Sequence, residues 1–289
     1  MSASRLDAAA NPLAPLVAYL GELKQGGKVD SWLCRAATLA HEEPPTPAML
    51  ERLIGIEPLL NARVRALLTQ ELKAAGLRSD GSFQDANQKL GTERVQRTCL
   101  LACVELWTEE LCKGSGVKPR PPVAQALAIS IASARLAERL VMVSRSAAMT
   151  GGLLRHLGQP FLIGMAQGRY RSILAAVAGT SRSVLDAEAE LLGFDHRAAG
   201  LVVGKLWSFP SHVTAATTAA HPVPQTIDIS WCVVAGEAIA HQLGYDGGAA
   251  NNPPDLPIDR LESVGIRTED IAQLSMEVAA EVQVYASAA

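Results

Sequence analysis

The sequence predicts an all-α protein built of two helical lobes. Aromatic residues make up only 4% of the chain while alanine and leucine are abundant, a balance that favours helices over sheets. With 289 residues, 48% of them hydrophobic, the chain can bury a large core. Glycine, proline and basic residues concentrate at 113–122, as in a linker. We therefore predict an N-terminal helical lobe at 1–112 and a C-terminal helical lobe at 123–289.

Charge and hydropathy exclude several function classes. A formal net charge of -3 and a pI near 6.1 provide no basic surface for nucleic acid or an acidic membrane. The longest uncharged stretch, 206–227, is interrupted by three prolines and is not expected to cross a membrane. The N-terminus has no basic segment followed by an apolar run, so no signal peptide is expected. These features predict a cytoplasmic protein.

Two amphipathic helices are predicted in the first lobe. Apolar residues from Leu59 to Leu72 recur about every 3.6 positions, and Gly76 follows where a glycine would end the helix. The stretch "GTERVQRTCLLACVELWTEEL" repeats the pattern. Thr92 is its expected N-cap, and Glu93 lies in its first turn.

The second lobe is predicted to have a buried helical centre. Residues 123–158 are apolar on several sides, as in helices at the middle of a bundle. Ser183 with Asp186 forms a capping signal before a further helix, and the Pro-Ser step at 210–211 opens a short helix that ends near 220.

Two more helices are predicted towards the C-terminus. The stretch "IDISWCVVAGEAIAHQLG" is typical of a buried helix, which Gly244 closes. Turn-forming residues fill the loop 245–257. Thr268 is expected to cap a final helix whose apolar side begins at Ile271.

No strong catalytic signature occurs. The chain lacks a phosphate-binding loop, a dinucleotide fingerprint, a nucleophile elbow and an HExxH zinc motif. Its five cysteines form no C-x-x-C pair, and Cys99 and Cys103 lie one helical turn apart in an apolar stripe. We therefore expect reduced thiols in the core and no cofactor.

Several motifs together resemble a known family. The stretch "GGLLRHLGQPFLIGM", residues 151–165, has the shape of the catalytic helix of HD phosphohydrolases, where His-Asp is usual in place of Arg155-His156. The run "AEAELLGFDHRAAGLVVGKLWSFPSHVTAATTAAHP" contains a Glu, then Gly-Phe-Asp-His, a Gly, a Trp, a Pro and a final His-Pro. With "ERLIGIEPLLNARV" and "DANQKLGTERVQRTCLLAC" upstream, residues 30–245 resemble the HDOD (HD-related output domain) family of bacterial signalling proteins.

The resemblance implies an all-α HDOD module whose C-terminal lobe is a degenerate HD-like bundle. By order along the chain, the metal-ligand positions of HD relatives fall at or near Leu127, Arg155, His156 and Gly236. Leucine and glycine side chains carry no donor atom. An arginine 4 Å away would repel each unit of a metal's charge by about 4 kcal/mol at an effective dielectric near 20. We therefore expect no metal ion and no catalytic residue.

The resemblance further implies regulation through protein contacts, with a histidine kinase, a diguanylate cyclase or a response regulator as partner. The expected function is that of a non-enzymatic adaptor or regulator in bacterial signal transduction. The chain departs from the family pattern at Ala220-His221, where His-His is usual before the proline.

Five retained side chains are candidates for a ligand site or an interface: Arg155, His156, His196, Trp207 and His221. A buried Arg155 would need an internal carboxylate, a bound anion such as a nucleotide phosphate, or solvent. His196 with Asp195 is either a structural pair at a helix start or part of a binding surface. Trp207 is either packed in the core or, if exposed, an interface anchor.

Two alternative functions stay open. In the first, a small anionic ligand such as a nucleotide binds at Arg155 and His156 and shifts the two lobes about the linker. In the second, the protein is a metal-dependent phosphohydrolase with a rearranged site that uses His156, His196 and His221 with Glu237. No metal-ligand spacing in the sequence supports the second alternative.

Overall fold

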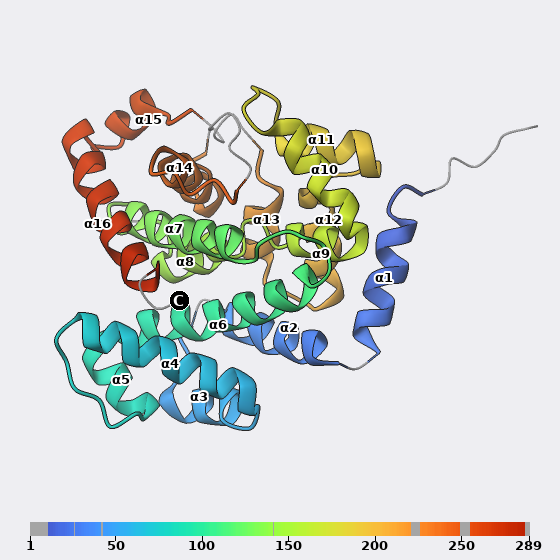
Figure 1. Ribbon diagram of the computed structural model, residues 1–289. Helices are drawn as coiled ribbons and strands as arrows, with labels where there is room; N and C mark the ends of the chain where they lie inside the picture. The colour runs from blue at the N-terminus through green and yellow to red at the C-terminus, as the bar shows by residue number, and fades with distance from the viewer. Residues whose placement is uncertain are drawn as a thin grey trace, which may run out of the picture.

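The computed structural model describes residues 11–286 except 26, 42, 141, 221–225 and 249–254. These residues form sixteen helices and no strand, which confirms the predicted all-α class (Figure 1). The first six helices are α1 (Ala14–Lys24), α2 (Lys28–Leu39), α3 (Pro47–Ile54), α4 (Pro58–Ala74), α5 (Phe83–Leu90) and α6 (Thr92–Cys112).

The helices after the connection at 113–119 form the larger part of the molecule. They are α7 (Arg120–Ala137), α8 (Arg145–Leu153), α9 (Gln159–Ala166), α10 (Gly168–Val177), α11 (Val184–Leu192), α12 (His196–Leu206), α13 (Ser211–Thr218), α14 (Ile229–Gln242), α15 (Ile258–Ser263) and α16 (Thr268–Ala286).

Most local signals place the helices correctly. Gly76 follows α4 with a φ of 71°, and Gly244 follows α14 with a φ of 84°, as expected for glycines that end helices. The Ser183 hydroxyl accepts a hydrogen bond of 3.0 Å from the Asp186 amide at the start of α11. The short helix predicted over 210–220 is α13, which ends at Thr218.

The predicted cap at Thr92 is wrong, because Thr92 is the first residue of α6 and Gly91 is the N-cap. Gly91 also ends α5, so one residue joins two helices. Its φ of 84° with a ψ of 153° is readily adopted only without a Cβ atom. The last helix, α16, likewise begins at Thr268 itself.

The connection between α6 and α7 is shorter than the predicted linker. It spans 113–119, because α7 begins at Arg120 and takes Pro121 and Pro122 into its first turn. Proline is tolerated there, since the first amides of a helix have no acceptor within it.

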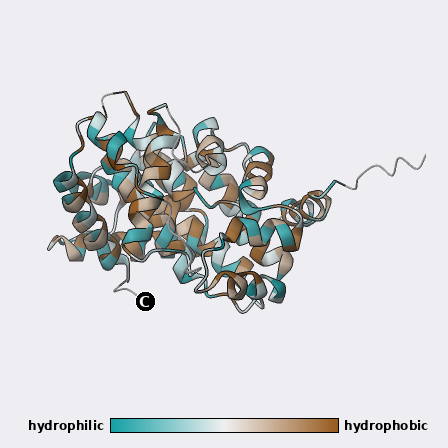
Figure 2. Ribbon diagram, turned by 90° about the horizontal axis from the view of Figure 1, so that it is seen from above, coloured by the Kyte–Doolittle hydropathy of each residue, from teal (hydrophilic) through white to brown (hydrophobic). Residues whose placement is uncertain are grey.

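One hydrophobic core extends through both halves of the chain, from Leu16 of α1 to Val282 of α16. Helix α7 lies at its centre and contacts α8, α14 and α16. Helix α6 contacts α2, α4 and α5 as well as α7, α8 and α9, so it lies between the two parts (Figure 1). Apolar residues gather in the interior (Figure 2). That the two predicted lobes form one module and do not unfold as independent units stays a prediction.

The cysteines and hydropathy agree with most sequence expectations. All five thiols are free, and four are buried, but Cys34 of α2 is exposed, which corrects the expectation of a core thiol there. Its neighbours Trp32 and Leu33 take the core-facing positions of that helix. Within the described part of the chain, no helix is long and apolar enough to span a membrane.

Candidate functional site

Arg155 lies in the turn after α8, and its side chain is 1% exposed. Its Nε donates a hydrogen bond of 2.9 Å to Oε2 of Glu237 on α14. Its Nη1 donates to the backbone carbonyls of Ala216 and Thr217 on α13. Of the three partners considered for Arg155, the structure has the internal carboxylate. The remaining nitrogen, Nη2, has no hydrogen-bond partner.

Glycines bring this turn close to its neighbours. A Cβ atom on Gly152 would lie 2.8 Å from Ser133 Oγ and 2.9 Å from the Ser130 Cα of α7. A Cβ atom on Gly158 would lie 2.1 Å from the His196 carbonyl oxygen. Only residues without side chains allow these approaches, so α8 and the following turn pack directly on the backbones of α7 and α12.

His156 lies between Glu237, the partner of Arg155, and a second histidine, His196. Its Nδ1 lies 3.0 Å from Nε2 of His196. Its Nε2 lies 3.2 Å from Oε1 of Glu237. Burial lowers the pKa of His156 to about 4, an effect larger than the opposing attraction of the Glu237 carboxylate. The ring is therefore neutral at pH 7.

Glu188 of α11 accepts hydrogen bonds from His196 and from Tyr170. Its Oε2 accepts from His196 Nδ1 at 2.7 Å and from the His196 backbone amide at 2.8 Å. Its Oε1 accepts from the Tyr170 hydroxyl of α10. Burial, then the charge of Glu188, raises the pKa of Tyr170 well above its usual value. Three donors thus satisfy a carboxylate whose side chain is 0% exposed.

The resulting network, called here the polar chain, consists of Arg155, Glu237, His156, His196, Glu188 and Tyr170. It extends through the interior from α14 to α10. Asp195 is not part of it: its carboxylate caps α12 by accepting from the Ala198 amide at 2.8 Å. Asp195 and His196 therefore have separate roles at the start of α12: Asp195 caps the helix, and His196 donates to Glu188.

The other sequence-predicted positions lie outside the polar chain. Leu127 is buried on α7, where it lines a small cavity with Arg97 and Glu281. Gly236 of α14 packs against α7, and a Cβ atom there would lie 2.6 Å from Ser133 Oγ. Neither side chain offers a donor atom. His221 lies outside the described residues.

Trp207 is buried at 5% exposure, so it is a packing residue and not an exposed anchor. Its Nε1 donates to Asp30 Oδ1 of α2 at 2.8 Å. Its ring centroid lies 6.3 Å from that of Phe161, within the range of favourable aromatic pairs. Trp207 therefore ties α12 to the N-terminal helices.

Three of the four residues of the rearranged metal site belong to the polar chain, and the fourth, His221, lies outside the described residues. His156, His196 and Glu237 do come together, as the rearranged site requires. However, Oε2 of Glu237 accepts a hydrogen bond from Arg155. His156 and His196 each use one ring nitrogen in the contact between the two rings. Among the residues that the structure describes, no group of three or more His, Cys, Asp or Glu side chains is arranged to hold a metal ion.

Glu188 and Tyr170 were not identified from the sequence as site residues. Glu188 does lie in the run "AEAELLGFDHRAAG" that carries the family resemblance. On α11 it shares a buried face with Val184 and Ala187, where an acidic residue needs a partner. No local pattern indicates Tyr170, because its contact with Glu188 joins two helices.

Sequence comparison adds an independent finding. A family model of the HDOD domain matches residues 76–223, just over half of the 289-residue chain. This region contains Arg155, His156, Glu188 and His196, whereas Glu237 lies beyond it. No curated protein matches the chain.

Solved structures share the fold over nearly the whole chain. A protein from Shewanella amazonensis SB2B, described as a "Putative phosphohydrolase", has a TM-score of 0.66 at 19% identity and covers 96% of this chain and 98% of its own. An "HDOD domain protein with unknown function" from Geobacter sulfurreducens has a TM-score of 0.65 at 16% identity, with the same coverage. A "Putative signal transduction protein" from Marinobacter aquaeolei VT8 has a TM-score of 0.72 at 17% identity and covers 99% of this chain and 67% of its own.

Proposed function

The chain belongs to the HDOD family, and from this premise we propose that it is a non-enzymatic regulator or adaptor in bacterial signal transduction. It acts through contacts with another signalling protein and changes that protein's activity. The fold shared with the Marinobacter protein, which is described as a signal transduction protein, supports this role.

The observation that carries the proposal is the ion pair between Arg155 and Glu237. At the place where the HD relatives use His-Asp to hold a metal, this chain has a buried arginine neutralised by a carboxylate from α14. The polar atoms of the region bond mainly to one another, as in a structural network. The helix is therefore retained for packing, and the surface of the module carries the function.

The expected partner is a histidine kinase, a diguanylate cyclase or a response regulator. The test is to capture partners with the tagged full-length chain from its native cells and to purify the recovered protein. Adding increasing amounts of the chain is expected to change the partner's phosphorylation or cyclase activity and to saturate at a fixed stoichiometry. Failure to recover a signalling protein reproducibly, or a recovered protein whose activity does not respond, contradicts the proposal.

A second candidate function is a sensor of a small anionic ligand, favoured by the buried Nη2 of Arg155, which has no hydrogen-bond partner. Calorimetry with nucleotides and with inorganic phosphate tests it. Arg155→Lys keeps the charge but removes the planar fork that binds phosphate, so binding should weaken. Arg182→Lys, at an exposed ion pair with Glu190, is the matched control. The absence of binding heat in the wild-type chain excludes this function.

The non-enzymatic part of the proposal has its own test. Purified protein is expected to contain no stoichiometric iron, manganese or zinc and to leave nucleotides and cyclic dinucleotides intact when these metals are added. A stoichiometric metal that is lost in His156→Ala, together with hydrolysis, would establish the rearranged phosphohydrolase site instead.

A further inference from the structure

The last helix, α16, packs along α7 and reaches α4, one of the helices before the connection at 113–119 (Figure 1). Its apolar stripe is buried in the core and consists of Ile271, Leu274, Val278 and Val282. The stripe stops one turn before the helix does, because none of the side chains described at 283–286 is buried. The last turn therefore depends on its polar contacts more than the rest of α16 does.

Two hydrogen bonds attach this last turn to α4 and α6. The side-chain amide of Gln70 on α4 donates to the Val284 carbonyl, one of the last four carbonyls of α16, which have no donor within the helix. The Tyr285 hydroxyl donates to Oε1 of Glu105 on α6 at 2.6 Å. Burial, then the charge of Glu105, raises the pKa of Tyr285, so the hydroxyl keeps its proton and remains a donor.

Glu105 is itself part of an ion-pair cluster that joins α4 to α6. Its Oε2 accepts from Arg63 Nη1 at 3.0 Å, and its side chain is 8% exposed. Arg63 also donates hydrogen bonds of 2.8 and 3.0 Å to the two carboxylate oxygens of Glu109. Bidentate pairing of this kind fixes the guanidinium, which in turn holds Glu105 in place for Tyr285.

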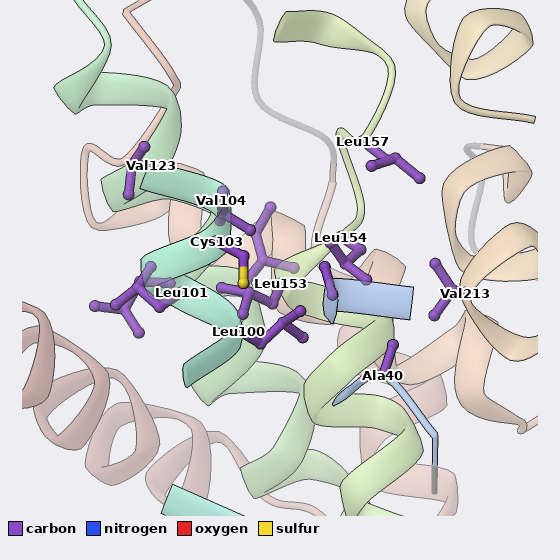
Figure 3. Packing of buried hydrophobic residues seen from close by; sticks show 14 of the residues in the cluster. Ala40, Leu100, Leu101, Cys103, Val104, Val123, Leu153, Leu154, Leu157 and Val213 are labelled. Atoms are coloured by element: carbon purple, nitrogen blue, oxygen red, sulfur yellow. The ribbon is translucent and has the colours of Figure 1, made fainter. Parts of the chain in front are cut away.

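A cavity of about 300 Å³ lies beside these contacts, at the junction of α4, α6, α7 and α16. Its lining includes Leu67 from a helix before the connection, Val123 from the helix after it, and Tyr285 of α16. In Figure 3, Val123 lies near Leu101 and Val104 of α6, at one edge of the core. The last turn of α16 is thus held beside a space that both parts of the chain surround.

We propose that the last turn of α16, residues 283–286, is a releasable strap across the two parts of the molecule. When closed, it bonds to α4 and α6 while the rest of α16 packs on α7. When released, it opens the cavity and frees α4 from α16, and the apolar stripe and the 2.9 Å pair of Glu281 with Arg97 stay in place. Local opening of this kind is expected where few apolar side chains are buried. The inference does not depend on the proposed signalling function.

Amide hydrogen exchange on the full-length chain tests the strap. In the wild-type chain, the amides of 283–286 should exchange at least about tenfold faster than those of 274–282, since they open by themselves. Tyr285→Phe keeps the ring but removes the bond to Glu105. It should accelerate exchange at 283–286 by about three- to tenfold, as expected for one lost hydrogen bond, and leave 274–282 unchanged.

Thiol labelling tests whether release of this turn opens the cavity. Val123 is 2% exposed, and Val123→Cys places a thiol in the lining. Iodoacetamide should alkylate this thiol about three- to tenfold faster when Tyr285→Phe is also present. The buried thiol of Cys103 lies outside the lining and should react equally slowly in both chains. Gln273→Ala, which removes an exposed hydrogen bond of 3.1 Å on α16, is the control and should change neither rate.

Each outcome supports or overturns the strap. Equal exchange rates along the whole of α16, or no acceleration in Tyr285→Phe, overturns it. Acceleration of every amide in the molecule would show that Tyr285 supports only global stability, and alkylation of Val123→Cys at an unchanged rate would show that the cavity does not open through this turn. If Tyr285→Phe does not fold, Gln70→Ala removes the other bond and is measured in the same way.

Discussion

Nδ1 of His156 and Nε2 of His196 lie 3.0 Å apart in the interior and join the turn after α8 to the start of α12. Each ring also faces a carboxylate, Glu237 for His156 and Glu188 for His196. The two histidines thus lie between two buried carboxylates that come from different helices. Glu237 is also paired with Arg155, and Glu188 also accepts a hydrogen bond from Tyr170.

The Arg155–Glu237 pair is expected to be a strong determinant of stability. Arg155→Ala or Glu237→Ala leaves one buried charge unpaired and should lower the free energy of unfolding by about 3 to 5 kcal/mol. The double variant should lose less than the sum, since neither charge is then left alone. Urea unfolding measures all three. Arg182→Ala, at an exposed pair, should change stability by no more than about 1 kcal/mol; strictly additive losses at 155 and 237 contradict the coupling.

His156 should make stability depend on pH. Burial, opposed by Glu237 and reinforced by His196 and Arg155, lowers its pKa from 6.5 to about 4. Between these values the unfolded chain binds more protons than the folded one. The contribution is therefore complete above pH 6.5 and is lost as the pH falls towards 4. Thermal unfolding from pH 7 to 4 should show this loss, and His156→Asn should reduce it. An NMR titration of His156 with a midpoint near 6.5 would disprove the shift.

Tyr170 should resist ionisation in the folded protein. Burial and the Glu188 carboxylate raise its pKa, and burial raises that of Tyr19 to about 12. Because the folded phenol holds its proton more tightly, this stability is present below pH 10 and is lost as the pH rises through the folded-state pKa. Absorbance near 295 nm should show fewer tyrosinates in folded than in unfolded protein at pH 11. Tyr170→Phe should leave that folded-state absorbance unchanged; a clear decrease contradicts the shift.

Gly158 should be required for the contact between His156 and His196. A Cβ atom there would lie 2.1 Å from the His196 carbonyl and 2.3 Å from the Gly200 amide nitrogen. Gly158→Ala must therefore push α12 away, at a cost of about 1 to 3 kcal/mol or more. Gly168→Ala is the matched control, because a Cβ atom there meets nothing within 4 Å. Equal melting temperatures for the two variants would be inconsistent with the close approach.

The molecule should unfold in a single transition. The core is continuous from α1 to α16, and Glu281 of α16 pairs with Arg97 of α6 at 2.9 Å and with Arg135 of α7 at 3.0 Å. Circular dichroism and tryptophan fluorescence should therefore give coincident melting curves. Glu281→Gln should shift both curves together to lower temperature. Two separated transitions would instead show that the predicted lobes fold independently.

The sequence by itself determined the helical class and most helix positions, because these depend on local interactions. Apolar residues repeating every 3.6 positions along α4 select its buried face whatever lies opposite. The serine at 183 caps the start of one helix, and the glycines at 76 and 244 follow the ends of two others. Each acts within a few residues of its helix terminus. The cap at Thr92 could not be predicted, because Gly91 serves two helices at once.

The sequence motifs also singled out Arg155, His156 and His196, but only the tertiary structure decided what they bond to. Arg155 and Glu237 are 82 positions apart, and the two histidines are 40 apart. The partner of a buried polar group depends on which helices pack together and in which register, and no local periodicity encodes this. The approach of α8 to α7 and of Gly158 to α12 sets that register. The tertiary structure thus placed a carboxylate beside Arg155, the partner that the sequence favoured over an anion or solvent but could not identify.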